Sequence, residues 1–204
     1  DDDDIKGQFT LEATGVIDVS NDLVIGGADA TNSNIELIDS DAGDDLPLTL
    51  AGKVTAAGDI VIDLATTALT ADVVMSGTLN ATDDVIIKTA ADQDITGAGD
   101  ITGDDISITA LGDATVVVGG IAAAGSAFIG SGTGAITTGP VTANANTGGA
   151  GTFAIEVQTT GAVTANGAYT ADSQAGLNIS IDPSEVINNA RFTATGNIDI
   201  FATE

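Results

Sequence analysis

The sequence predicts an all-β fold, a β-solenoid of about nine coils of 20–25 residues each. Three observations support this prediction. A unit of about nine residues recurs along nearly the whole chain, and each copy closes in a short alternating strand. The spacing of the copies is close to the length of one solenoid coil. The composition, with 26 glycines and only 3% aromatic residues, suits a narrow aliphatic core better than a compact globule.

The repeat is clearest at Val54–Ile62, where the sequence is V-T-A-A-G-D-I-V-I. Later copies open at Leu79, Ile101, Ile121, Val141, Val163 and Phe192. The steps between these openers are 20 to 29 residues. An earlier copy opens at Leu11, which lies 43 residues before Val54, or close to two steps. A step of this length holds about three short strands, which is the content of one coil.

Each predicted strand has an inward and an outward face, because successive side chains alternate across a strand. Ile60 and Ile62 therefore face the core, whereas Asp59 and Asp63 face solvent. The competing architecture is a pilin-like β-sandwich, since short strands every 8–12 residues also suit that fold. Such a subunit would donate its N-terminal strand to the next one. We favour the solenoid, because a sandwich gives no reason for one unit to recur at one spacing.

The chain divides into two parts. Residues 1–8 form an acidic segment that we expect to be flexible, and residues 9–204 form a single solenoid domain. The longest step between openers contains Asp182-Pro183-Ser184-Glu185. An aspartate cap, a proline in the first turn and a glutamate three residues after the cap predict a short helical insertion near 182–190. The first residue is Asp1, so we expect a processed chain or a segment of a longer one.

The charge of the chain excludes several functions. There are 30 acidic and four basic residues, for a formal net charge of −26. Such a surface repels nucleic acid and anionic membranes, and no apolar run approaches the roughly 20 residues that span a bilayer. Salt or divalent cations must screen the charge, which predicts an extracellular setting. The absence of cysteine and histidine removes disulfides, thiol nucleophiles, zinc sites and imidazole acid–base chemistry.

Three copies of the repeat resemble a known family. These are G-D-I-V-I at Gly58–Ile62, G-D-D-I-S-I at Gly103–Ile108 and T-G-N-I-D-I at Thr195–Ile200. They resemble the repeats of filamentous-haemagglutinin-like exoproteins and of autotransporter passengers, over nearly all of the chain. The resemblance implies a right-handed parallel β-helix and a secreted or surface-exposed rod that adheres or scaffolds. The N-terminal secretion domain of that family, with its asparagine–proline motifs, is not found in this sequence.

One predicted loop is a candidate metal site. Its sequence is D-S-D-A-G-D-D, and alternate aspartates around a glycine are typical of a calcium loop. The candidate ligands are Asp39, Asp41, Asp44 and Asp45. The EF-hand pattern is incomplete, because Leu50 stands at the twelfth position, where a bidentate glutamate belongs. We favour a solvated acidic loop over a Ca²⁺ site, with Ca²⁺ as the one candidate cofactor.

Paired aspartates form a second candidate site. Asp83-Asp84 and Asp104-Asp105 occupy equivalent places in consecutive copies, so they would stack about 5 Å apart in a solenoid. A ladder of like charges predicts a stripe that binds cations or sugars. Paired carboxylates also hydrolyse glycosides, but such enzymes add aromatic platforms and basic residues. Here Tyr169 is the only tyrosine and Arg191 the only arginine, so we expect no enzymatic activity.

Two other features have simpler interpretations. The glycine-rich stretch Gly119–Gly151 has no G-K-S/T and no basic residue, so it is not a phosphate loop. We expect Phe128, Phe153 and Phe192 to be core rings, because large apolar side chains are usually buried.

The two ends of the chain carry similar copies, F-T-L-E-A-T-G-V-I-D-V from Phe9 and F-T-A-T-G-N-I-D-I from Phe192. Solenoids usually cap their ends, and the sequence shows no capping helix at either end. Two matching ends predict a head-to-tail contact, which does not close and therefore builds filaments. The predicted interface consists of Phe9, Leu11, Val16, Ile17, Val19, Phe192, Ile198, Ile200 and Phe201.

These observations predict a structural subunit of an extracellular or cell-surface filament or matrix fibre, with the protein itself as partner. The alternative is an adhesin shaft segment that binds glycans or a host surface.

Overall fold

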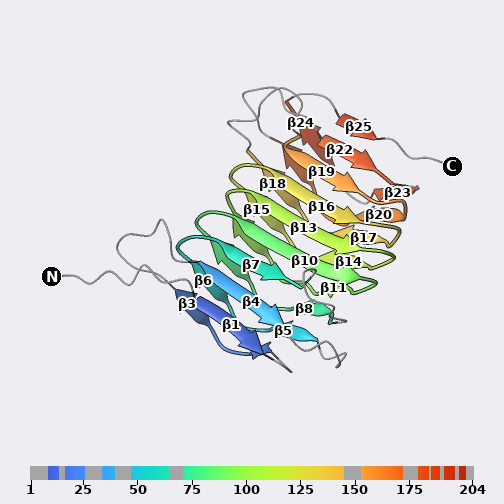
Figure 1. The fold of residues 1–204 in the computed structure, drawn as a ribbon. Helices are drawn as coiled ribbons and strands as arrows, with labels where there is room; N and C mark the ends of the chain where they lie inside the picture. Colours follow the sequence, from blue (N-terminus) through green and yellow to red (C-terminus); the bar gives the residue numbers. More distant parts are fainter. Residues whose placement is uncertain are drawn as a thin grey trace.

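The protein is an all-β parallel solenoid in the computed structural model, with its coils stacked from the N-terminal to the C-terminal end (Figure 1). The structure describes residues 9–13, 17–25, 34–39, 47–64, 71–144, 153–171, 179–183, 185–188, 191–195 and 198–200. Every strand pairing among them is parallel. The β-sandwich alternative is therefore wrong, because sandwiches of that kind are built from antiparallel sheets.

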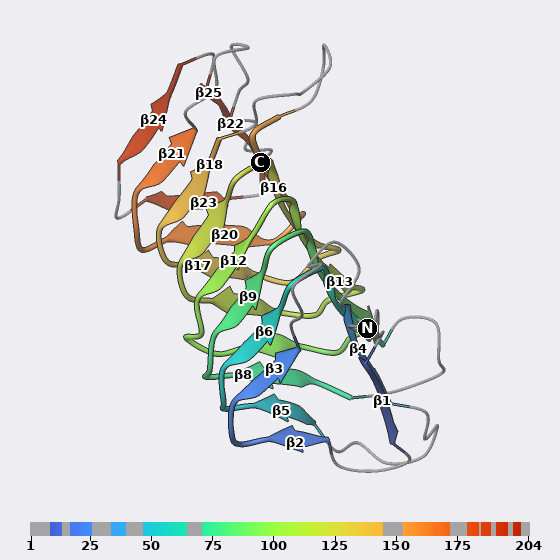
Figure 2. The ribbon, with the colours of Figure 1, turned by 90° about the vertical axis from the view of Figure 1, so that its left-hand side faces the viewer.

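Three parallel sheets form the faces of the solenoid, which Figure 2 shows from the side. Sheet 1 contains β1 (Phe9–Ala13), β4 (Ile35–Asp39), β7 (Ile60–Asp63), β10 (Val85–Ala91), β13 (Ile106–Leu111), β16 (Ala127–Ser131), β19 (Ile155–Gln158), β22 (Ile179–Asp182) and β25 (Ile198–Ile200). Sheet 2 contains β2 (Asp18–Val19), β5 (Leu48–Leu50), β8 (Val73–Met75), β11 (Ile95–Thr96), β14 (Val116–Val118), β17 (Ile136–Thr138), β20 (Ala162–Ala165) and β23 (Glu185–Asn188). Sheet 3 contains β3 (Leu23–Ile25), β6 (Val54–Ala56), β9 (Leu79–Ala81), β12 (Ile101–Gly103), β15 (Ile121–Ala123), β18 (Val141–Ala143), β21 (Tyr169–Ala171) and β24 (Phe192–Ala194).

Each coil contributes one strand to each sheet. The nine-stranded and the two eight-stranded sheets thus correspond to eight complete coils among the described residues, with β25 beginning another. This is slightly fewer than the nine coils that the spacing predicts. Sheet 1 therefore extends one strand beyond sheets 2 and 3 at the C-terminal end.

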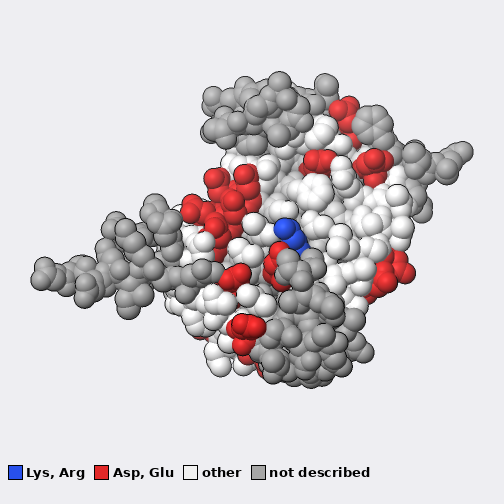
Figure 3. Space-filling view, in the orientation of Figure 1, with Lys and Arg blue, Asp and Glu red and all other residues white. Residues whose placement is uncertain are grey.

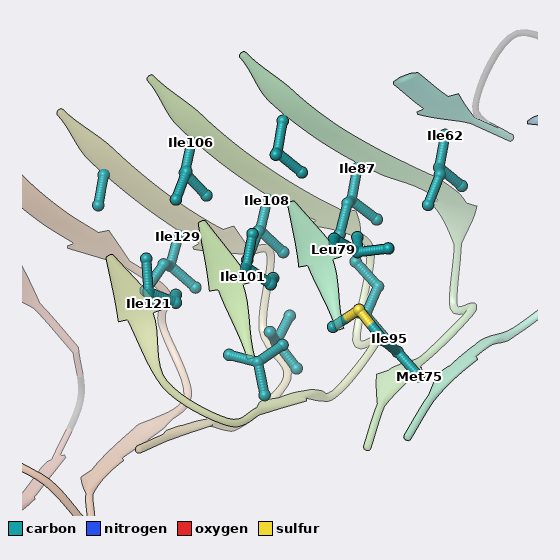
Figure 4. Close-up of a cluster of buried hydrophobic side chains, with 14 of the residues drawn as sticks. Ile62, Met75, Leu79, Ile87, Ile95, Ile101, Ile106, Ile108, Ile121 and Ile129 are labelled. Carbon is teal, nitrogen blue, oxygen red and sulfur yellow. The ribbon is translucent and has the colours of Figure 1, made fainter. Parts of the chain in front are cut away.

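The core consists of aliphatic side chains stacked in register from coil to coil. In sheet 1 the inward row Ile62, Ile87, Ile108 and Ile129 is fully buried (Figure 4). Ile60 and Ile62 face the core as predicted, whereas Asp59 and Asp63 are partly exposed. Because one aliphatic side chain packs on the same kind of side chain above and below, the narrow interior needs few aromatic rings.

A column of glycines occupies the corner between sheets 2 and 3. Its members are Gly52, Gly77, Gly99, Gly119 and Gly139. A Cβ added at Gly77 would overlap the carbonyl oxygen of Gly52, and one at Gly99 would overlap that of Gly77. The backbones of successive coils approach so closely there that no side chain fits between them.

The structure corrects the alignment of the copies. Phe9 lies in sheet 1, where its register partner is Ile35, whereas Phe192 lies in sheet 3 on Tyr169. The copy predicted to open at Val163 belongs to sheet 2. The error has a simple cause: an apolar residue followed by Thr or Ala recurs in more than one sheet, so sequence similarity alone does not assign a copy to a face.

The short helix predicted near 182–190 is also wrong. Glu185–Asn188 forms strand β23, whose backbone pairs with β20 in the register Val163–Val186. The capping signature is local, and a parallel ladder with the preceding coil satisfies the backbone of this segment instead. None of the residues that the structure describes forms a helix, so none of them lies in a helix long and apolar enough to cross a membrane.

Candidate functional sites: the aspartate ladders and the coil ends

A ladder of polar residues runs along the corner that precedes the strands of sheet 1. Its rungs are Asn34, Asp59, Asp84, Asp105 and Ser126. The Oδ1 atom of Asp59 accepts the backbone N–H of Asp84 at 3.0 Å, and Asp84 Oδ1 accepts that of Asp105 at 3.1 Å. Asp105 Oδ1 accepts both the backbone N–H and the hydroxyl of Ser126, at 2.6 and 2.8 Å. The predicted stacking of Asp84 on Asp105 is thus confirmed, and each carboxylate accepts a hydrogen bond from the backbone of the next coil.

The like charges along this ladder change the acidity of its middle rung. Burial raises the pKa of Asp84, and the carboxylates of Asp105, Asp59 and Asp104 raise it further. The hydrogen bond from the Asp105 backbone lowers the pKa of Asp84 and so offsets part of this effect. The ladder therefore combines backbone hydrogen bonds, which stabilise the ionised form, with repulsion, which destabilises it.

The same device recurs at the other corners. Asp72 Oδ1 accepts the backbone N–H of Asp94 at 2.8 Å, and Asp94 Oδ1 accepts that of Thr115 at 2.7 Å. Asp100 Oδ1 accepts the N–H of Gly120 at 2.7 Å. These aspartates thus have a structural role. Each carboxylate is long enough to reach the next coil, where it accepts a backbone N–H that has no carbonyl partner at the corner.

Asp92 and Asp113 form a directly interacting acidic pair on successive coils. Asp92 has a left-handed backbone, with φ of 66°, and its Oδ1 accepts the backbone N–H of Asp113 at 3.1 Å. A hydrogen bond with the Asp92 side chain, followed by the Asp92 charge, raises the pKa of Asp113. Gly112, with φ of 70°, leaves room for the Asp92 carboxylate, which a Cβ there would overlap.

The predicted calcium loop lies mostly outside the described residues. Asp41, Asp44 and Asp45 are not described, and Asp39 is the last residue of β4. Within the described part of the chain, no group of three or more acidic residues is arranged to hold a metal ion. On the face shown in Figure 3 the carboxylates gather in separate groups around a small basic patch. Lys88 Nζ lies 3.9 Å from Asp63 Oδ2 on sheet 1.

The C-terminal end of sheet 1 exposes residues that elsewhere form the core. Ile198 and Ile200 of β25 are 41% and 43% exposed, although their register partners Ile179 and Ile181 in β22 are fully buried. Phe192 in β24 is partly buried and packs edge to face on Tyr169, with ring centroids 5.1 Å apart. The core row of sheet 1 thus continues to the last described strand.

The N-terminal end is similar. Phe9, Leu11 and Val19 are partly buried against the core, and Ile17 is already buried. Val16 and Phe201, the remaining members of the predicted interface, lie outside the described residues. Phe9 and Leu11 occupy the inward positions of β1, which correspond to Ile198 and Ile200 in β25. The two terminal strands of sheet 1 therefore present matching apolar rows.

Phe128 departs from the sequence-based expectation. It is half-buried on the outer face of β16, between Ser107 and Glu156 of the neighbouring strands, and not in the core. The alternation in A-F-I-G-S contains the signal for this, because Ala127 and Ile129 already occupy the inward positions. Tyr169 is the ring that lies fully buried in the core, and its hydroxyl is 2.6 Å from Thr138 Oγ1.

No protein-family model, no curated protein and no solved structure matches the chain. What is established is the class of the fold, a parallel β-solenoid built from repeated coils.

Proposed function

We propose that the protein is a structural subunit of an extracellular or cell-surface filament, which polymerises head to tail through β25 of one subunit and β1 of the next. The observation that carries this proposal is the exposure of Ile198 and Ile200, whose equivalents in the preceding coil are fully buried. Exposed apolar rows on a terminal strand favour pairing with another chain. The high acidic charge and the absence of cysteine are compatible with a saline exterior.

The two strands fit each other in register. Continuing the parallel ladder of sheet 1 places Phe9 on Ile198 and Leu11 on Ile200, with Thr10 beside Asp199. This arrangement stacks apolar side chains on the core row and brings no two carboxylates directly opposite each other among these six residues. Since the contact uses different surfaces on the two copies, it does not close and continues into a filament.

The resemblance to filamentous-haemagglutinin-like and autotransporter repeats supports a secreted rod, because those proteins use the same kind of short G-D-x-hydrophobic strand units. Within the described residues, the outer edges of β1 and β25 have no strand partner. A neighbouring coil, whether from a second copy or from further chain, would supply that partner.

The proposal is tested by blocking one end at a time. The Ile198→Asp/Ile200→Asp double variant and the Phe9→Asp/Leu11→Asp double variant should each remain monomeric, whereas the parent protein should form rods in 0.5 M NaCl or in Ca²⁺. Negative-stain microscopy and analytical ultracentrifugation measure the outcome. An equimolar mixture of the two variants should form heterodimers and nothing longer, because each retains one intact end.

The matched control is Leu111→Asp. Leu111 is 44% exposed, as Ile198 and Ile200 are, but it lies on β13 in the middle of the solenoid. This variant should polymerise as the parent does. The proposal is wrong if the parent protein stays a monodisperse monomer at high concentration in both NaCl and Ca²⁺. It is also wrong if either double variant still forms rods.

The alternative function is an adhesin shaft that binds glycans, and the aspartate ladder supports it less well. The Oδ1 atoms of Asp84 and Asp105 are already engaged with the backbone of the next coil. A different part of the surface, on the outer face of sheet 1, offers a better location for sugar binding and does not depend on polymerisation.

A further inference from the structure

Two adjoining hollows form a shallow groove on the outer face of sheet 1, where its strands end. One, of about 280 Å³, is lined by Ser131, Gly132, Gln158, Thr159, Thr160 and Asp182. The other, of about 200 Å³, includes Thr109, Leu111, Phe128 and Gly130. Ser131, Gly132 and Gln158 line both, so the hollows are continuous. The groove crosses β13, β16, β19 and β22, and none of its lining residues lies on β1 or β25.

The groove exists because a glycine interrupts an outward column of side chains. Gly130 lies between Thr109 and Gln158 in the register of sheet 1. A Cβ at Gly130 would come within 2.8 and 2.9 Å of two ring carbons of Phe128, so the ring lies across the space that a side chain would occupy. The half-buried Phe128 ring thereby forms part of the groove, and the absence of a side chain at Gly130 leaves room for the ring to lie there.

The polar groups around the ring are held in place and act mainly as acceptors. The Gln158 amide donates to Glu156 Oε1, which orients it and leaves its carbonyl oxygen and second N–H for a ligand. The Ser131 hydroxyl donates to Ala114 O at 2.6 Å, and that of Thr160 donates to Gly132 O at 3.2 Å. Because these hydroxyl hydrogens point inward, their oxygens are acceptors on the groove side. Asp182 adds an exposed carboxylate at the margin.

We propose that this groove binds a neutral saccharide, which stacks the C–H face of one pyranose ring on Phe128 and donates its hydroxyls to Gln158 and Asp182. The aromatic face is electron-rich and attracts the polarised C–H groups of a sugar, in addition to dispersion. A set of acceptors suits a ligand that carries many O–H donors. The net charge of −26 disfavours anionic polysaccharides, and we choose a neutral saccharide because the ring platform and the hydroxyl acceptors need no charge on the ligand.

The test uses the full-length protein and a panel of neutral gluco-, galacto-, manno- and N-acetylglucosamine oligosaccharides, first immobilised as an array and then in titration calorimetry. At least one neutral series should bind, with a Kd that changes less than twofold between 0.05 and 0.5 M NaCl. Phe128→Ala should weaken binding at least tenfold, and Gln158→Ala several-fold. Phe128→Tyr, which keeps the platform, should bind as the parent does.

Two further variants separate the site from the stability of the fold. Ile86→Ala removes an outward apolar side chain from the same column of sheet 1, two strands from Phe128, and should leave binding unchanged. Gly130→Ala should displace the ring and weaken binding while circular dichroism and melting temperature stay close to those of the parent. The proposal is overturned if no neutral saccharide binds at millimolar concentration, or if Phe128→Ala binds like the parent. Binding only of sulfated or of amine-bearing sugars, with strong salt dependence, overturns it as well.

Discussion

Asn34 and Asp59 exchange two hydrogen bonds across neighbouring coils. Asn34 Oδ1 accepts the backbone N–H of Asp59, and Asn34 Nδ2 donates to Asp59 Oδ2, each at 3.0 Å. The same corner in the following coils carries aspartates instead. Their Oδ1 atoms also accept the backbone N–H of the next coil, but a carboxylate has no N–H group that could donate the second hydrogen bond. Asparagine can therefore accept the backbone N–H of the next coil at this corner without adding a charge, as Asn34 does.

The first prediction concerns the middle rung of this ladder. Asp84→Asn should stabilise the protein at pH 7 by about 0.5 kcal/mol, because it keeps the acceptor for the Asp105 backbone and removes a repelling charge. Urea unfolding followed by circular dichroism measures the change. Asp18→Asn, which removes the same charge from an exposed position in β2, is the control and should have a smaller effect. A loss of stability in Asp84→Asn would show that the carboxylate itself is required there.

The second prediction concerns pH. The pKa values of Asp84 and Asp113 are raised above the ordinary value of 3.8 in the folded protein, so these two groups bind protons more tightly in the folded state than in the unfolded chain. The contribution of these groups to stability is fully present below that ordinary value and is lost as pH rises through their raised pKa values. The melting temperature at low salt should therefore increase from pH 7 toward pH 4.5. A melting temperature that falls steadily over this range would contradict the assignment.

The third prediction compares two glycines of one coil. Gly99→Ala should destabilise the protein by about 2–4 kcal/mol, because the added Cβ overlaps the Gly77 carbonyl and forces two coils apart. Gly103→Ala is the matched control. Its Cβ would lie 3.0 Å from the nearest atom, and its register neighbour in β15 is already Ala123, so the change should be within about 1 kcal/mol. Equal effects of the two substitutions on the unfolding midpoint would refute the role of the glycine column.

The fourth prediction uses the single tyrosine. Burial raises the pKa of Tyr169 to about 12, although its hydrogen bond with Thr138 lowers it slightly. Tyrosinate absorbance of the folded protein should appear near pH 12, and stability should be lost as pH rises from about 10 toward that value. Tyr169→Phe should cost about 1–2 kcal/mol, since the buried Thr138 hydroxyl loses its partner. If tyrosinate formed near pH 10 in the folded protein, the buried position of the ring would be wrong.

The fifth prediction separates screening from specific calcium binding. With 30 acidic residues, the chain should gain thermal stability with added NaCl. At equal ionic strength CaCl₂ should raise the melting temperature more than NaCl only if Ca²⁺ occupies a site. The variant Asp41→Asn/Asp44→Asn/Asp45→Asn tests the candidate loop, for which the sequence favours a solvated acidic segment over a Ca²⁺ site. If Ca²⁺ stabilises the parent and this variant equally, the loop is not the site.

The class of the fold could be predicted from the sequence because the pattern that specifies it is local and repeated. Alternation places Ile60 and Ile62 inward in any strand, and repetition of the same pattern at the length of one coil leaves parallel stacking as the arrangement that buries every copy. The stacking of Asp84 on Asp105 followed from the same spacing.

The assignment of each strand to a face could not be predicted in the same way. Phe192 and Phe9 begin similar segments, but they lie in different sheets, because the corner lengths between strands decide the face and those lengths vary. The segment after Asp182 carries a helix-capping signature, yet its backbone pairs with β20. That choice depends on a strand more than 20 residues away, which no local signal reveals. The prediction for Phe128 is wrong for a different reason: its residue type favours the core, but the alternation of its own strand, with Ala127 and Ile129 inward, places it on the outer face.

The difference in length between sheet 1 and the other two sheets has a mechanical consequence. Hydrogen bonds between coils run along the rod, so tension on its ends is shared by three ladders at every junction between complete coils. At the proposed joint between subunits, the described strands supply only one ladder, β25 on β1. A filament pulled from both ends would therefore part at this joint before the junctions between complete coils separate, so the complete coils stay folded and a broken fibre can rejoin.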